Sequence, residues 1–237
     1  MQALIFDCDG VLVDTERDGH RVAFNQAFAA ANIDAEWDVS TYGELLKVAG
    51  GKERMRHYFE HNGWPPGAEA DKDDFLAGLH KSKTGLFTDI IASGELALRP
   101  GIIRIVDEAI AAGIRLGVCT TSALKSVAGV LDLMGPERKS KFEFVLAGDV
   151  VSRKKPDPEI YLMGLERLAL PADQCVVIED SRNGLLAAHG AQIPVLITTS
   201  SYTTDEDFSE ASRVVPELGD PPAPVVSLAD LAALSGQ

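Results

Sequence analysis

Basic residues, cysteines and long apolar runs are all scarce in this chain of 237 residues. Its 22 lysines and arginines face 36 aspartates and glutamates, and the resulting net charge of −14 repels phosphate backbones and anionic membranes. No apolar stretch approaches the ~18 residues of a membrane-spanning helix. The apolar residues 3–6 follow no charged segment and end at Asp7, unlike a signal peptide. We therefore expect a cytoplasmic protein with no nucleic-acid or membrane partner.

The three cysteines are an odd number, stand far apart and each adjoin an apolar run. We expect reduced, buried thiols rather than a disulfide framework. Hydrophobic residues make up 46% of the chain, which is ordinary for a globular protein and enough for a sizeable core. The length fits one large domain or a domain with a modest insert.

Short apolar runs alternate with helical patterns along most of the chain. Continuous apolar strands that alternate with helices are typical of a parallel sheet covered on both faces. The pattern therefore predicts an α/β fold with a doubly wound, Rossmann-like core. The expected strands lie at residues 3–6, 114–119, 142–146, 175–178 and 194–198, with a weaker one at 214–215, and the expected helices at 102–110, 122–134, 158–169 and 183–190.

Residues 15–95 interrupt this alternation, because they contain helical patterns and no strand-like run. Helices are expected near residues 21–31 and over a long stretch near 75–91, separated by Gly50-Gly51 and by the Gly/Pro-rich residues 62–67. We expect an inserted all-helical cap domain at 15–95 and a catalytic core formed by 1–14 together with 96–237.

Acidic, hydroxyl and basic side chains follow the expected strands, at the edge where parallel sheets bind ligands. Two buried carboxylates, Asp7 and Asp9, are costly after an apolar strand unless a cation is near. Taken singly, such residues are also common as helix caps or solvated turns. Taken together, they favour a Mg²⁺-assisted phosphoryl-transfer site. The other strand ends deliver Thr120-Thr121-Ser122, Arg153-Lys154-Lys155 and Glu179-Asp180.

The order and spacing of these residues resemble the four motifs of the haloacid-dehalogenase-like phosphohydrolase superfamily. The matching residues are Asp7-x-Asp9-Gly10-Val11-Leu12, Thr120, Lys155-Pro156 and Glu179-Asp180. The dehalogenase branch lacks the second acid of the first motif, so Asp9 favours phosphate chemistry. The insert after the first motif resembles the small cap type of that superfamily.

This resemblance implies catalytic roles for four residues. Asp7 is expected to be the nucleophile that forms an aspartyl-phosphate, and Asp9 the general acid and then the general base. Thr120 is expected to hold phosphoryl oxygens and Lys155 to neutralise charge, a role for which Lys154 is the rival.

The same resemblance implies a Mg²⁺ cofactor, held by the Asp7 carboxylate, the Asp9 backbone carbonyl and Asp180, with Glu179 assisting. Thr121 and Ser122, the small residues beside Thr120, are expected on the substrate side.

Candidate substrate ligands also occur in the expected cap. Gly51 and Lys52 follow Gly50 at the start of a helix, where open backbone N–H groups and a positive charge suit an anion, although a plain turn before a solvated helix gives the same pattern. Glu16 can accept hydrogen bonds from sugar hydroxyls. His20 and Lys81 complete the expected substrate-binding set, and Arg17, His80 and Lys83 are further candidates. Each of these residues, taken singly, is more often a surface residue than a ligand.

Several segments are similar to the CbbY group of this superfamily, and especially to its plant-type members. The segments are residues 14–21, 23–25, 42–46, 50–54, 78–81, 148–151 and 219–222. That group contains phosphatases that convert xylulose 1,5-bisphosphate, an inhibitor of Rubisco in the Calvin cycle, to xylulose 5-phosphate. The resemblance implies a small sugar phosphate as partner, and the plastid stroma as the location in a plant or alga. We also expect a monomer.

Two related enzymes and one binding protein remain as alternatives. A β-phosphoglucomutase shares the core, but its pattern has a histidine where this chain has Gly19, with His20 one place later. A broad-specificity sugar-phosphate phosphatase is the second alternative. A non-catalytic sugar-phosphate sensor would have no need of all four motifs.

Overall fold

The computed structural model describes residues 1–48, 51–68, 70–94 and 96–236. The chain divides into two compact units. The first, which we call the sheet unit, is formed by Met1–Asp14 and Ala97–Gln237, and the second, the helical unit, by Thr15–Leu96. This division ends the insert at residue 96, one residue beyond the expected boundary. Gly50, one of the two glycines expected in a phosphate loop, lies outside the described residues.

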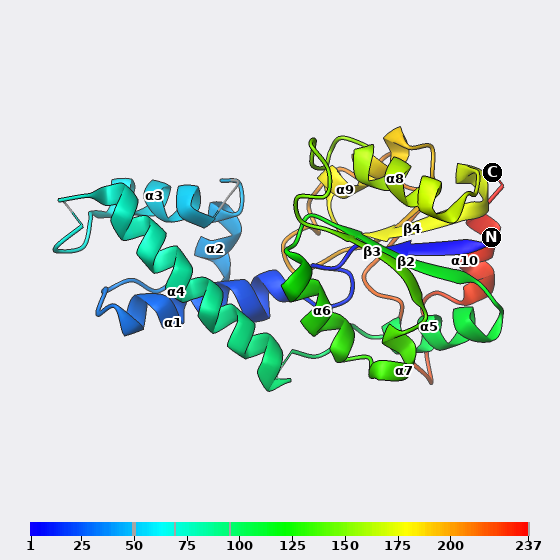
Figure 1. Cartoon of the computed structure of the whole chain (residues 1–237), viewed down its shortest axis with the longest axis horizontal. Helices are drawn as coiled ribbons and strands as arrows, with labels where there is room; N and C mark the ends of the chain where they lie inside the picture. Colours follow the sequence, from blue (N-terminus) through cyan, green and yellow to red (C-terminus); the bar gives the residue numbers. More distant parts are fainter. Residues whose placement is uncertain (49–50, 69, 95, 237) are drawn as a thin grey trace. The chain divides into compact units, whose positions relative to one another are not determined.

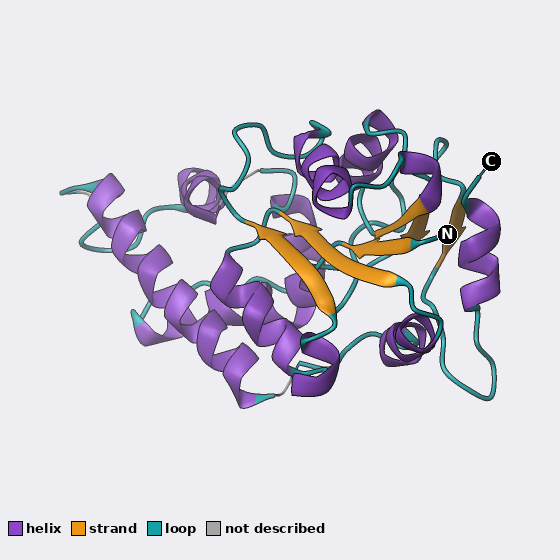
Figure 2. Cartoon of the chain, turned by 45° about the vertical axis from the view of Figure 1, so that its right-hand side comes forward, coloured by secondary structure: helices purple, strands orange, loops and turns teal. Residues whose placement is uncertain are grey.

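The sheet unit is built on six parallel strands in the order β3-β2-β1-β4-β5-β6. This order confirms the doubly wound fold that the sequence predicts. Figure 2 shows the strands in orange, with the helices of this unit in purple around them. Every residue of β1 is fully buried, as expected for a central strand that is covered on both faces. The strands are β1 (Ala3–Phe6), β2 (Arg115–Thr120), β3 (Phe142–Ala147), β4 (Cys175–Glu179), β5 (Val195–Thr198) and β6 (Arg213–Val215).

Alternate residues of β1 enter two separate hydrophobic clusters, one on each face of the sheet. Leu4 and Phe6 join the cluster that contains side chains of α5 (Ile102–Ala111), α6 (Leu124–Asp132) and α10 (Leu228–Leu234). Ala3 and Ile5 join the cluster that contains side chains of α8 (Glu159–Leu168) and α9 (Arg182–Gly190). Figure 1 shows α8 on one side of the sheet and α5 on the other. The short α7 (Pro136–Lys139) and η2 (Ala172–Gln174) complete the unit.

The helical unit has an aromatic core. Trp37 is fully buried, and its ring centroid lies 4.7 Å from that of Phe24 and 4.9 Å from that of Phe28. The long α4 begins where the Asp71 side chain accepts hydrogen bonds from two backbone N–H groups, and it ends at Gly94, whose φ is +73°. The elements are η1 (Glu16–His20), α1 (Arg21–Ala30), α2 (Val39–Leu45), α3 (Gly51–Asn62) and α4 (Lys72–Ser93).

Over the described ranges, no helix combines the length and apolar character needed to cross a membrane. The three cysteines are all buried and unbridged, as their spacing predicts.

Candidate active site

Three neighbouring strands of the sheet, β2, β1 and β4, deliver the expected catalytic side chains at their carboxyl ends. Asp7 follows β1, Thr120 is the last residue of β2, and Glu179 is the last residue of β4, with Asp180 next. All four are buried. Because the strands are parallel and adjacent, these side chains meet at one edge of the sheet, as the sequence predicts.

Lys155 joins two of these carboxylates. Its Nζ lies 2.6 Å from Oδ1 of Asp7 and 2.5 Å from Oε1 of Glu179, and it also donates to the carbonyl oxygen of Cys119 at 2.9 Å. The Lys155 side chain is only 7% exposed, so the three N–H bonds of a nearly dry ammonium group all have partners. Lys155 therefore balances part of the negative charge of the site.

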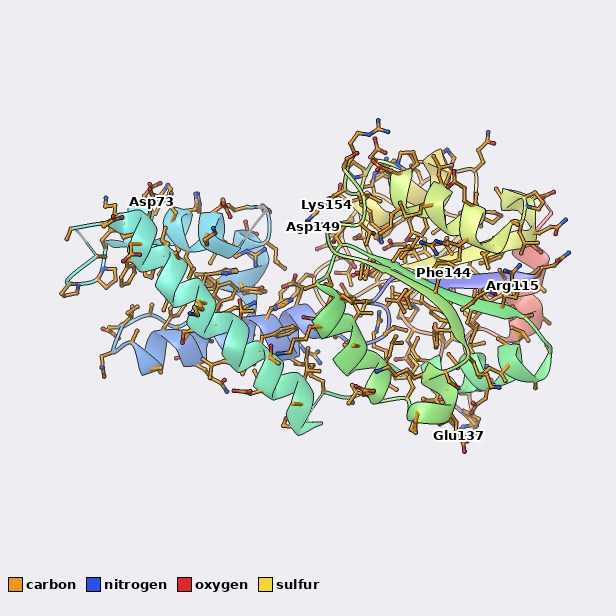
Figure 3. The ribbon with its side chains drawn as sticks, in the orientation of Figure 1. Asp73, Arg115, Glu137, Phe144, Asp149 and Lys154 are labelled. Carbon is orange, nitrogen blue, oxygen red and sulfur yellow. The ribbon has the colours of Figure 1, made fainter. Side chains whose placement is uncertain are left out.

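The neighbouring Lys154 points elsewhere. Its side chain is half exposed, and its Nζ pairs with Oδ1 of Asp149 at 2.8 Å (Figure 3). Of the two adjacent lysines, the structure thus brings Lys155 to the strand ends, which is the one that precedes the proline of the motif.

Glu179 is fixed from several sides. The Tyr161 hydroxyl donates to its Oε1 at 2.6 Å, and the backbone N–H of Asp180 donates to its Oε2 at 3.1 Å. A Cβ at Gly184 on α9 would overlap its carboxyl group. The sequence did not single out Tyr161, because it is one apolar-face residue among several on α8. No neighbouring residue in the chain indicates that its hydroxyl contacts Glu179.

Burial and like charges raise the pKa values of two carboxyl groups of the site, those of Asp7 and Asp180. Burial, followed by the charges of Glu179 and Asp9, raises the pKa of Asp7 to about 7, although the Lys155 charge acts in the opposite direction. Burial and then the charges of Glu179 and Asp7 raise the pKa of Asp180 well above its usual range. Three carboxyl groups therefore share one site with a single ammonium group.

The donor set of this site suits a hard divalent cation. Asp7, Glu179 and Asp180 each offer a carboxylate oxygen, and the three oxygens lie within 4.8 Å of one another. Mg²⁺ and Ca²⁺ prefer carboxylate oxygens, and a divalent charge would stabilise the ionised forms that burial disfavours. The residues present thus fit the metal ion that the sequence motifs imply.

The loop after β1 carries Asp9, which is only partly buried. The hydroxyl of Ser122, in the loop after β2, donates to Oδ2 of Asp9. Oγ1 of Thr120 accepts a hydrogen bond from the backbone N–H of Ser122 at 3.2 Å. The loops after β1 and β2 are thereby joined beside the acidic cluster, whereas Thr121 is exposed.

In the helical unit, Glu16 belongs to a hydrogen-bonded chain with two residues that were not among the expected ligands. The Tyr42 hydroxyl donates to Oε2 of Glu16 at 2.6 Å, and Nη1 of Arg54 donates to the Tyr42 oxygen at 2.9 Å. Arg54 is only 8% exposed and also donates from Nε to the carbonyl of Leu45. The Arg54 guanidinium is therefore a buried cation.

His20 contacts Lys83, another of the candidate residues of the long helix. Nζ of Lys83 lies 2.7 Å from Nδ1 of His20, whose ring stacks on Phe87 at 3.8 Å between centroids. Burial and then the charges of Lys83 and Arg54 hold the pKa of His20 well below its usual range, so Nδ1 is the acceptor of a neutral ring. Lys81 is exposed on α4.

Gly51 and Lys52 begin α3 beside His80. A Cβ at Gly51 would lie 2.7 Å from Nε2 of His80, so the glycine allows a close approach of α3 to α4. Lys52 is exposed. The pKa of His80 is lowered first by burial, then by the charge of Lys83 and then by the charge of Lys52. Five basic residues of the helical unit interact electrostatically in this way, although the chain as a whole is acidic. We refer to them as the basic cluster: His20, Lys52, Arg54, His80 and Lys83.

Comparison with known proteins assigns the chain to a family of hydrolases. The family described as haloacid dehalogenase-like hydrolase matches residues 1–192, and the chain belongs to this family of enzymes.

Within it, the chain is similar to proteins named CbbY, as the sequence segments indicate. It is 51% identical over 224 residues to the CBBY-like protein of Arabidopsis thaliana, with 93% of this chain and 70% of the relative aligned. The crystal structure of a mutant CbbY from Rhodobacter sphaeroides in complex with xylulose 1,5-bisphosphate gives a TM-score of 0.81 at 39% identity and covers 98% of this chain and 99% of that one. The phosphorylated carbohydrates phosphatase of Thermotoga maritima is 31% identical, with 81% of this chain and 82% of the relative aligned.

Proposed function

We propose that this chain is a Mg²⁺-dependent sugar-bisphosphate phosphatase that converts xylulose 1,5-bisphosphate to xylulose 5-phosphate and phosphate. The observation that carries the proposal is the buried arrangement of Asp7, Lys155, Glu179 and Asp180 at neighbouring strand ends. The Rhodobacter sphaeroides CbbY complex with this bisphosphate supports the choice of substrate. The reaction would remove an inhibitor of Rubisco.

In the first step, a carboxylate oxygen of Asp7 attacks the phosphorus of the phosphate group on C1. The bond between phosphorus and the sugar oxygen breaks, and protonated Asp9 gives its proton to that oxygen. An aspartyl-phosphate and xylulose 5-phosphate result. Lys155 is placed for charge neutralisation, since its Nζ is already 2.6 Å from Asp7.

In the second step, the Asp9 carboxylate takes a proton from water, whose oxygen attacks the aspartyl-phosphate. The bond between phosphorus and the Asp7 oxygen breaks, phosphate leaves, and both acids return to their starting states. The Ser122 hydroxyl, which donates to Asp9, orients this carboxyl group between the two steps. We assign Thr120 to the phosphoryl oxygens and Thr121 to the substrate side of the same loop.

Asp7, Glu179, Asp180 and the Asp9 backbone carbonyl would hold Mg²⁺. When bound, the ion supplies the positive charge that lets an anionic nucleophile approach an anionic phosphate.

We assign the helical unit the role of a cap that takes the phosphate that is not cleaved. The basic cluster supports this assignment, because Lys52, Arg54 and Lys83 collect cations in a chain whose net charge is −14. Gly51 at the start of α3 adds backbone N–H groups. Glu16 and His20 are the candidates for hydrogen bonds with sugar hydroxyls, and Lys83 takes the place expected for Lys81.

A monomer in the cytoplasm, or in the plastid stroma of a plant or alga, is the setting that we propose for this activity. The Arabidopsis thaliana relative supports the second location.

The deciding experiment is phosphate release with Mg²⁺ from xylulose 1,5-bisphosphate beside ribulose 1,5-bisphosphate, fructose 1,6-bisphosphate and β-glucose 1-phosphate. We expect strong preference for the first substrate and no release from any in Asp7→Asn. Equal, low release from all four would refute the substrate and favour a broad phosphatase. Formation of glucose 6-phosphate would make the chain a β-phosphoglucomutase.

Two variants test the roles of single residues. Asp9→Asn should bind substrate and lose most turnover, and near-normal turnover would remove it from acid–base catalysis. Lys52→Ala should raise KM for the bisphosphate much more than for a monophosphate such as phosphoglycolate. Equal losses on both substrates would remove Lys52 from the second phosphate site.

A further inference from the structure

Arg99 joins the loop after β1 to two other loops of the sheet unit. Its guanidinium donates to the carbonyl oxygen of Gly10, to that of Thr199 at 2.7 Å and to that of Pro216 at 2.6 Å. It also donates to the carbonyl of Thr198 at 3.1 Å. The planar guanidinium holds several N–H donors in a rigid fork, so it fixes these carbonyls relative to one another.

The backbone of Arg99 grips the same loop at a second point. Its N–H donates to the carbonyl oxygen of Leu12 at 2.8 Å, while its side chain reaches Gly10. One residue thus holds both sides of the turn that follows Asp9. Within this turn, the Gly10 N–H donates to the carbonyl of Val13 at 2.8 Å.

Gly10 connects this clamp to the acidic cluster. Its φ is +79°, and a Cβ at this position would overlap the carboxyl group of Asp180. The Gly10 backbone therefore packs directly against Asp180 while its carbonyl is held by Arg99. A shift of this peptide would move Asp9, one residue before it, and would change the space that confines Asp180.

We propose that Arg99 is a positioning residue for the reaction. It holds the Gly10 peptide against Asp180 and thereby keeps the Asp9 side chain in its position relative to Asp7 and Asp180. It acts through the loop, without touching either acid that performs chemistry in the proposed mechanism. The inference rests on the proposed phosphatase function.

Arg104 provides a matched control within the same unit. Its guanidinium also clamps carbonyl oxygens, since Nη2 donates to Gly219 at 2.7 Å, to Val226 at 2.8 Å and to Leu218 at 3.0 Å. None of these carbonyls belongs to the loops that carry the described acidic cluster. Both arginines hold the segment after β6, at Pro216 and at Leu218 and Gly219, but only Arg99 also holds the loop after β1. Arg99→Gln and Arg104→Gln therefore differ in whether the clamp on that loop is lost.

The experiment measures kcat, KM, thermal stability and amide hydrogen exchange of the peptide covering residues 7–13 in the whole protein. For Arg99→Gln we expect a fall in kcat on the order of 10–100-fold, with KM changed less than about threefold, because a misplaced acid slows chemistry more than binding. Arg99→Lys, which keeps one charge and fewer donors, should recover part of kcat. Exchange in residues 7–13 should quicken in Arg99→Gln.

The control separates positioning from general stability. Arg104→Gln should lower the unfolding temperature to a similar extent and leave both kcat and the exchange of residues 7–13 as in the wild type. The proposal is overturned if Arg99→Gln loses no more kcat than Arg104→Gln, or if the exchange of residues 7–13 is the same in both. Should Arg99→Gln not fold, Arg99→Lys against Arg104→Lys makes the same comparison. If the wild type releases no phosphate from any sugar phosphate, the proposed function fails, and the exchange measurement alone decides whether Arg99 holds the loop.

Discussion

Replacing Gly184 by alanine tests whether Glu179 is confined as the structure indicates. Gly184 is buried in α9, and a Cβ there would overlap the Glu179 carboxyl group. Glu179 is only 1% exposed and is tied to Lys155 and Tyr161, so it has no free direction in which to turn. The added methyl group must push it away from these partners.

The expected sign follows from two opposing effects. Alanine in place of glycine inside a helix stabilises by about 1 kcal/mol, whereas overpacking a dense interior costs about 1–3 kcal/mol. Stretching the hydrogen bonds of a buried carboxyl group adds to the cost. We therefore expect Gly184→Ala to destabilise by roughly 1–2 kcal/mol, which is a fall in unfolding temperature of roughly 2–8 °C for a unit of this size. Phosphatase activity should fall with it.

Gly85→Ala is the matched control, since this glycine lies in α4 and its Cβ would meet no atom within 4 Å. The same substitution should there stabilise by up to about 1 kcal/mol. Both tryptophans, Trp37 and Trp64, lie in the helical unit, so their fluorescence reports the control, while far-ultraviolet circular dichroism reports both units. If Gly184→Ala is as stable as the wild type, or gains stability as the control does, the tight packing of Glu179 against α9 is wrong.

Three further predictions concern single contacts. The pKa of His20 is lower in the folded chain than in the unfolded one, so the contribution of His20 to stability should fall as the pH drops below about 6.5, by at most ~1.4 kcal/mol per pH unit, whereas the raised pKa values of Asp7 and Asp180 act in the opposite direction. The test is therefore the difference in stability between the wild type and His20→Gln, measured by urea unfolding with tryptophan fluorescence between about pH 7.5 and 5. A difference that does not change with pH would contradict the burial of a neutral His20. Ser122→Ala removes the donor to Asp9 and should lower kcat by up to about tenfold at constant KM; an unchanged kcat would show that this hydrogen bond has no role in turnover. Lys155→Met leaves two buried carboxylates facing each other and should cost about 3–5 kcal/mol of stability together with nearly all turnover of every sugar phosphate; retention of activity on any of them would contradict the central position of Lys155.

The strands could be predicted from the sequence because each is a short apolar run bounded by polar residues. The run at residues 3–6 is β1 with both ends correct, and the run at 114–119 is β2 shifted by one residue. Parallel pairing then placed the polar residues after these strands at one edge of the sheet. The strand order itself comes from pairings between residues far apart in the chain, such as Ala3 with Cys175, which a local pattern does not contain.

The surroundings of the site were less predictable. Tyr161 and Arg99 act through partners 18 and 89 residues away in the chain, on Glu179 and Gly10, and neither lies in a recognisable local motif. Lys83 is different, because it was already a candidate residue and its burial also has a local signal in the sequence. The apolar residues Leu76, Leu79, Phe87 and Ile90 of α4 recur at helical spacing, and position 83 continues their buried face, whereas Lys81 falls on the exposed side.

The buried charges give a reason to prefer a bisphosphate over a monophosphate. Among the residues that the structure describes, the buried carboxyl groups are Asp7, Glu179 and Asp180 of the sheet unit, and the buried side-chain cations of the helical unit are Arg54 and Lys83. Burying any of them costs several kcal/mol in the absence of a compensating charge, so a fold under no functional constraint would expose them. An acidic group of this kind suits a divalent cation and the phosphate it assists, and the basic cluster suits a second anion. In the function that we propose, the acidic group takes the phosphate that is cleaved and the basic cluster takes the phosphate that is not, so a substrate with one phosphate would use only the first of these charge groups.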